Sequence, residues 1–138
     1  MAATDTQTQT VTLTVPVTCE VSKDALHGLF VTALEGGIGY WSVCTKYRWR
    51  AEDGGDDLDG FFADIEETET DEDDAPTHRI DAACILRGLA YFAQPGEGYR
   101  HVRSVARAVL MGDEDVDYDA EDADCIVQAG LFNEVVYG

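Results

Sequence analysis

Residues 113–124, DEDVDYDAEDAD, gather eight carboxylates within twelve positions. Acids stand at positions 1, 3, 5, 7, 9 and 12, close to the pattern of a calcium-binding EF-hand loop. Position 6 is Tyr118, where the sharp turn needs glycine, and position 12 is Asp124, one methylene shorter than the usual glutamate. Asp119 is a favourable N-cap, so a helix starting there would cut the loop short. The sequence favours an acidic helix entry and predicts no metal and no cofactor; calcium binding is the alternative.

A second group of residues could hold an anionic ligand. Tyr40 follows the glycine-rich turn at 36–39 and precedes alternating basic residues. An aromatic face with nearby cations can stack a base and pair with a phosphate. The candidate ligand residues are Tyr40, Lys46, Arg48, Arg50, Arg100, Arg103 and Arg107. The alternative is that Tyr40 covers a hairpin whose cations pair with acids on the returning strand.

The glycines at 36–39 do not form a phosphate-binding loop of the usual kind. Such loops run from a strand into a helix, whereas these glycines lead from a helix into a strand. We expect Gly36 and Gly37 to end the helix in the left-handed conformation. A bare floor for a ligand is the alternative reading.

Nothing in the chain indicates nucleophilic or acid–base catalysis. Three histidines, His27, His78 and His101, have no recognisable Ser or Cys partner, and no pair of carboxylates stands out. The four cysteines are far apart and form no C-x-x-C pair, which predicts reduced thiols inside a cell. We therefore expect no catalytic residues and no enzymatic activity. No signal peptide or membrane span is expected either.

The net charge of −19 is concentrated in two segments. Residues 51–75 hold 13 acids and residues 113–124 hold 8, with no Lys or Arg in either. We expect a partner with a basic surface and no direct contact with nucleic acid. Duplex DNA carries about one charge per 1.7 Å of axis, so carboxylates at similar density could occupy the groove of a DNA-binding protein. The candidate partner-binding residues are Asp56, Asp57, Asp59, Asp64, Glu66, Glu69, Asp71, Glu72, Asp73 and Asp74. A solvated acidic loop is the alternative.

Alternating patterns predict strands. Apolar residues at the odd positions of 11–21 predict a strand, edge-placed or bent because of Pro16. In residues 40–50 we expect Trp41, Val43, Tyr47 and Trp49 on one apolar face, and residues 61–66 return to complete a hairpin.

Caps and helical spacing predict four helices. The first helix is expected to begin after Ser22 and the second after Asp81. The third is expected to cover residues 102–110 and the fourth about residues 123–131. The prediction is an α+β fold: a small antiparallel sheet of about three strands with about four helices on one face. Residues 1–9 are expected to be a flexible tail and residues 10–138 a single domain.

Two segments, TALEGGIGYW (32–41) and ADCIVQAGLFNEVVYG (123–138), resemble signatures of small uncharacterised proteins of tailed bacteriophages, particularly those of actinobacteria. Where those relatives often have Phe-Gly-Glu, this chain has Phe132-Asn133-Glu134. The resemblance implies a viral setting and no activity. We expect a cytoplasmic accessory or anti-defence protein in an infected host, which binds a basic host protein through its acids. Sequestration of a nucleotide signal is the alternative, and homo-oligomerisation remains open.

Overall fold

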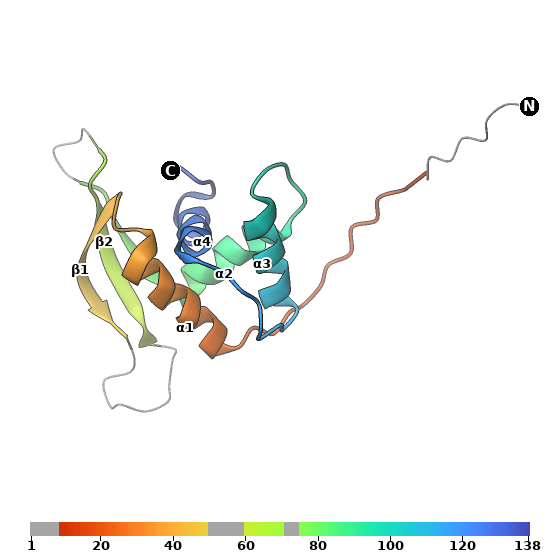
Figure 1. Cartoon of the computed structure of the whole chain (residues 1–138), viewed down its shortest axis with the longest axis horizontal. Coiled ribbons are helices and arrows are strands. Elements are labelled where there is room, and N and C mark those ends of the chain that lie inside the picture. The colour runs from red at the N-terminus through yellow and green to blue at the C-terminus, as the bar shows by residue number, and fades with distance from the viewer. Residues whose placement is uncertain (1–8, 50–59, 71–74) are drawn as a thin grey trace, which may run out of the picture.

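The computed structural model describes residues 9–49, 60–70 and 75–138, which form a three-stranded antiparallel sheet and four α-helices (Figure 1). The predicted α+β class is confirmed. The elements are α1 (Lys23–Thr32), its π-helical extension η1 (Ala33–Gly37), β1 (Ser42–Arg48), β2 (Phe62–Glu67), β3 (Thr77–Asp81), α2 (Ala82–Ala93), α3 (Arg100–Leu110) and α4 (Ala120–Phe132). One face of the sheet packs against the helices through buried residues such as Ile65 and Ile80.

The predicted N-terminal strand is wrong as an element of this sheet. Residues 9–21 are extended but pair with no strand in the described chain. The third strand is β3, which the sequence pattern did not predict because few of its residues are apolar. Its place beside β2 puts Ile80 opposite Ala63 and His78 opposite Ile65, and so closes the inner face of the sheet. The element order therefore begins with a helix.

The hairpin of β1 and β2 is confirmed, but a bulge changes which residues of β1 share a face. The register shifts between Cys44 and Lys46, which leaves Thr45 without an opposing residue on β2. Val43 pairs with Glu66, whereas Tyr47 pairs with Ala63, and paired residues point to the same side. Val43 and Tyr47 thus lie on opposite faces, which contradicts the single apolar face expected from strict alternation.

The helices begin where the sequence places their caps. The Ser22 side chain accepts a hydrogen bond from the Ala25 amide at 3.1 Å, and Asp81 accepts one from Cys84 at 2.9 Å. Asp119 and Asp122 form a capping box at the start of α4. This confirms that the helix starts inside the acidic segment.

Gly36 and Gly37 have a different role from the one expected. Neither has a positive φ, and the helix continues through them as the π-helical turn η1. A Cβ on Gly37 would lie 2.7 Å from the Ala120 carbonyl oxygen and 3.3 Å from the Asp124 Cβ. These glycines therefore let η1 pack closely on the first turn of α4, and neither the left-handed stop nor a ligand floor accounts for them.

Candidate functional site

The segment that joins α3 to α4 is an acidic loop held in place by its aromatic and aliphatic residues. We use "acidic loop" for residues 113–121. Val116 and Tyr118 are partly buried against the core. The Tyr118 hydroxyl packs close to Gly28 of α1, because a Cβ added at Gly28 would lie only 2.8 Å from it. The Asp113 side chain accepts a hydrogen bond from the Asp115 amide at 2.9 Å. The exposed acids of the loop are Asp113, Glu114, Asp115, Asp117, Asp119 and Glu121.

The acidic loop borders a shallow depression shared with the start of α1. Asp24 of α1 lines it together with Asp113 and Glu114, and Val109 and Tyr118 supply apolar surface. None of its described lining residues is Lys or Arg. Figure 1 shows the segment that joins α3 to α4 beside the first turn of α1. Carboxylates from two parts of the sequence are thus gathered on one side of the molecule, away from the sheet.

Two acids of the segment 113–124 point inward. Asp122 is 4% exposed; its carboxylate accepts from the Asp119 amide and lies 2.9 Å from His101 Nδ1. Hydrogen bonding and charge from Asp122 raise the pKa of His101 above its usual value. The backbone amide of Asp122 lowers the pKa of Asp119, so the cap stays ionised. These contacts stabilise the start of α4 and leave the other acids for solvent.

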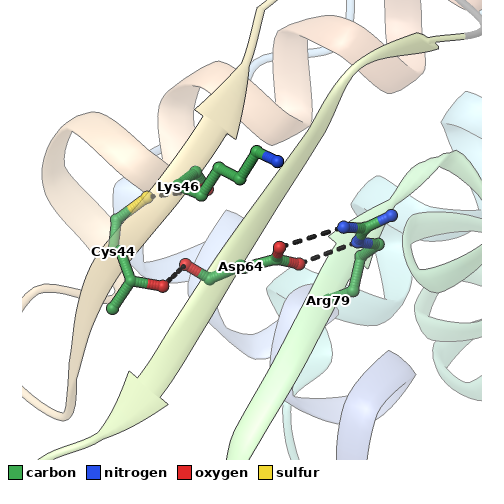
Figure 2. Close-up of polar contacts among 5 residues, drawn as sticks. Cys44, Lys46, Asp64 and Arg79 are labelled. Carbon is green, nitrogen blue, oxygen red and sulfur yellow. Dashed lines mark hydrogen bonds and ion pairs between the residues drawn. The ribbon is translucent and has the colours of Figure 1, made fainter.

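The acids predicted on the sheet are partly neutralised within the protein. Arg79 donates two hydrogen bonds to Asp64, at 2.7 and 2.9 Å, and Lys46 is the register partner of Asp64 (Figure 2). The Arg79 contact is the main cause that lowers the pKa of Asp64. Glu66 is half-buried and Glu69 is exposed. The predicted residues Asp56, Asp57, Asp59, Asp71, Glu72, Asp73 and Asp74 lie outside the described residues.

The alternative ligand residues do not form one site. Tyr40 donates a hydrogen bond to Asp124 at 2.7 Å on α4, whereas Lys46 and Arg48 are on β1. Figure 1 shows β1 and α3, which carries the predicted arginines, at opposite ends of the domain. On α3, Arg103 donates to the Gly98 and Gln94 carbonyls and Arg107 to the Ala93 carbonyl, while Arg100 is exposed. Arg50 lies outside the described residues.

Sequence reasoning missed Phe62, which the sheet places among three cations. Its ring centroid lies 4.1 Å from Arg79 Cζ, 5.5 Å from Arg48 Cζ and 5.9 Å from Lys46 Nζ. The half-buried ring is on the face of β2 opposite the buried Phe61. The signal was available in principle: Phe61 and Phe62 are adjacent, so in a strand one of them must point away from the core.

A buried polar cluster connects residues 32–41 with residues 123–138. Asp124 accepts hydrogen bonds from Trp41 Nε1 at 2.8 Å, Tyr40 Oη and Gln128 Nε2. The fully buried Gln128 accepts the amides of Val136 and Tyr137 and so fastens the C-terminal segment. Tyr137 in turn stacks on Trp41, with ring centroids 5.2 Å apart. Residues from these two segments therefore pack against each other and have a structural role.

The surroundings of His27 and of two of the cysteines are those of structural residues. His27 is half-buried and its Nε2 lies 2.9 Å from the Trp49 carbonyl oxygen, as a structural histidine would. Burial raises the pKa of the Cys84 and Cys125 thiols to about 12, which keeps them as poor nucleophiles at neutral pH. No group of three or more His, Cys, Asp or Glu within the described ranges is arranged to hold a metal ion.

The fold and site define an acidic α+β protein with an anchored, exposed acidic loop. Comparison with protein-family models, with curated proteins and with solved structures found no match. Among the described residues, none of the helices is both long and apolar enough to cross a bilayer.

Proposed function

We propose that this chain is a non-enzymatic accessory protein of tailed-phage type that acts in the host cytoplasm, as a host-interaction or anti-defence factor. It binds a basic, nucleic-acid-binding host protein through its acidic surface. The observation that carries the proposal is the acidic loop, where six carboxylates are exposed on a backbone anchored by Val116 and Tyr118. A loose tail would lose conformational entropy on binding, and an anchored loop avoids much of this cost.

The number of charges in this short loop suits a site that normally accepts DNA. A DNA-binding groove positions Lys and Arg against a duplex that carries about one phosphate charge per 1.7 Å of helix axis, counting both strands. Six exposed acids within residues 113–121, with Asp24 beside them, present several negative charges over a short distance. Binding would release counterions from the acids and the basic partner, so affinity should fall steeply as salt rises.

Affinity capture from a lysate of an actinobacterial host tests the proposal with matched variants. The loop variant carries Asp113→Asn, Glu114→Gln, Asp115→Asn and Asp117→Asn. The control carries Glu20→Gln, Glu35→Gln, Glu97→Gln and Glu134→Gln, four exposed acids elsewhere on the chain. Both lose four charges, and Asn at position 113 can still accept the Asp115 amide.

Wild type and control should retain a DNA-binding protein that the loop variant does not. Duplex DNA should compete for that protein, and retention should weaken between about 50 and 200 mM salt. Equal retention by both variants would show that only net charge matters, and the proposal would be wrong. Retention of no DNA-binding protein by the wild type would contradict it as well.

Phe62 and its three cations favour a second candidate function, sequestration of a small anionic nucleotide. A base could stack against the half-buried Phe62 ring while the phosphate lies near Lys46 and Arg48. A ligand that binds only the folded state raises the melting temperature. A panel of linear and cyclic nucleotides should therefore raise the melting temperature of the wild type and leave that of Arg48→Ala unchanged. No rise with any nucleotide would rule this candidate out.

A further inference from the structure

The N-terminal segment has the features of a strand that lacks a sheet. Residues 9–21 are extended, and no backbone hydrogen bond connects them to the rest of the described chain. Val11, Leu13, Val15 and Val17 are 96%, 82%, 59% and 71% exposed. Thr12, Thr14 and Pro16 alternate with them on the other side. Such a strongly alternating apolar face is unfavourable in water and is expected to be covered.

The sheet offers a free edge that matches this segment. Among the described strands β1 pairs only with β2, so its other side is an edge available to a further strand. β1 is seven residues long and, with its bulge at Thr45, has six register positions, a length close to that of residues 11–17. Val43 and Tyr47 on this edge are 49% and 57% exposed, one on each face of the sheet. The edge is thus incompletely covered on both faces.

The two faces of β1 fit the two faces of the segment. Cys44 and Tyr47 point to the side of the sheet that packs on the helices, since they pair with the buried Ile65 and Ala63. The Val/Leu face of the segment, formed by Val11, Leu13, Val15 and Val17, would extend that apolar layer. The Thr/Pro face would then lie on the open side of the sheet, beside Lys46. Pro16 cannot donate a ladder hydrogen bond, and it is acceptable in a strand that becomes the new edge.

β3 is a poorer acceptor than β1. It is only five residues long, it runs directly into α2, and its exposed residues, Thr77 and Arg79, are polar. The position of the segment argues against binding to β1 of its own molecule. Figure 1 shows residues 9–21 leaving the domain on the side of α3 and running away from β1.

We propose that residues 11–17 of one copy add as a fourth strand to the free edge of β1 in a second copy. Reciprocal exchange makes a twofold dimer in which each sheet has four strands. The backbone ladder supplies the pairing, and the Val/Leu face of each segment is covered by the partner.

The mass of the full-length protein in solution, measured over a concentration series, tests the proposal with two charge-matched variants. Leu13→Glu with Val15→Glu places carboxylates on the apolar face, whereas Thr12→Glu with Thr14→Glu places them on the other face. All four side chains belong to the exposed segment, so the fold of each domain does not depend on them. The wild type and the threonine variant should be dimers, and the apolar-face variant should be a monomer.

A mixing experiment identifies the edge that receives the segment. Cys44→Glu with Tyr47→Glu places carboxylates on the inner side of β1, at exposed positions. This variant alone and the apolar-face variant alone should both be monomers. Mixed together they should form a heterodimer, because one copy contributes an intact edge and the other an intact segment.

Several results would overturn the proposal. A wild type that stays monomeric at all concentrations would exclude strand exchange between two copies. This conclusion would hold even if hydrogen exchange showed residues 11–17 protected within the monomer. Identical behaviour of the apolar-face and threonine variants would show that the Val/Leu face does not direct association. A mixture that stays monomeric would exclude β1 as the acceptor.

Discussion

Trp41 Nε1 donates a hydrogen bond to Asp124 Oδ1 across 2.8 Å, joining residues 83 positions apart in the sequence. Both side chains are buried, with Trp41 fully inaccessible and Asp124 4% exposed. The bond connects the turn after α1 and η1 to the N-terminal half of α4. A buried carboxylate is stable only when its oxygens are satisfied, and here three side-chain donors satisfy them. Asp124 therefore belongs to the framework that positions the acidic loop.

Removing this carboxylate should destabilise the protein strongly. Asp124→Ala leaves Trp41 Nε1 and Gln128 Nε2 with fewer acceptors, and an unsatisfied buried donor costs about 1–3 kcal/mol. We expect the free energy of unfolding in urea to fall by at least that amount. Glu121→Gln, at an exposed position in the first turn of the same helix, is the control and should lower it by less than about 1 kcal/mol. Similar losses in both variants would contradict the role given to the cluster.

The contact between α2 and α4 should not tolerate side chains at its two glycines. A Cβ on Gly88 would lie 1.9 Å from the Ile126 carbonyl oxygen, and a Cβ on Gly130 would lie 2.1 Å from that of Cys84. Gly88→Ala or Gly130→Ala must separate the helices, and overpacking of this kind costs about 1–3 kcal/mol or more. Thermal unfolding should show a lower midpoint for both variants. Gly39→Ala, with no heavy atom within 4 Å of the added Cβ and no positive φ, should leave the midpoint within a few degrees of the wild type or raise it.

The His101–Asp122 pair should make stability depend on pH near neutrality. The folded-state pKa of His101 is raised by Asp122, and Asp119 contributes in the same direction. The stabilisation is complete below the unfolded pKa of about 6.5 and is lost as pH rises through the higher folded pKa. The difference in unfolding free energy between wild type and His101→Gln should therefore be largest in mild acid and should shrink at alkaline pH. NMR titration of His101 should give a pKa above 6.5, and a lower value would contradict this assignment.

Three of the four cysteines should differ in reactivity. Cys44 is exposed on β1, whereas burial raises the pKa of Cys84 and Cys125 to about 12. Alkylation with iodoacetamide at neutral pH should therefore modify Cys44 rapidly in the native protein, and Cys84 and Cys125 only after unfolding. Peptide mass spectrometry identifies the modified sites. Rapid native alkylation of Cys125 would contradict this assignment and would show a reactive thiol in the depression that His101 also lines.

The helices could be predicted because their signals are local. Ser22, Asp81 and Asp119 cap helices through side-chain bonds to amides three residues ahead, and such motifs lie within one stretch of sequence. The inner stripe of α2 is equally visible, since Leu89 and Phe92 recur at helical spacing. The hairpin was predicted as well, except for the bulge at Thr45, which no local pattern announced.

The sheet was harder to predict because a strand is defined by its neighbour. Residues 11–17 have the stronger alternating pattern, yet β3, with few apolar residues, occupies the place beside β2. For the candidate site, the sequence determined that acids would cluster at 113–124. It could not determine that Asp122 and Asp124 turn inward, because their partners, His101 and Trp41, come from α3 and the turn after η1.

The sequence by itself determined the charge, the caps at which α1, α2 and α4 begin, the α+β class and the existence of the acidic loop, because composition, caps and periodicity act over a few residues. The tertiary structure alone decided which carboxylates face solvent, that Tyr40 bonds Asp124 instead of lying beside Lys46, and which strand completes the sheet. These outcomes depend on contacts between residues distant in the chain, where close packing and the need to satisfy buried polar groups select one arrangement.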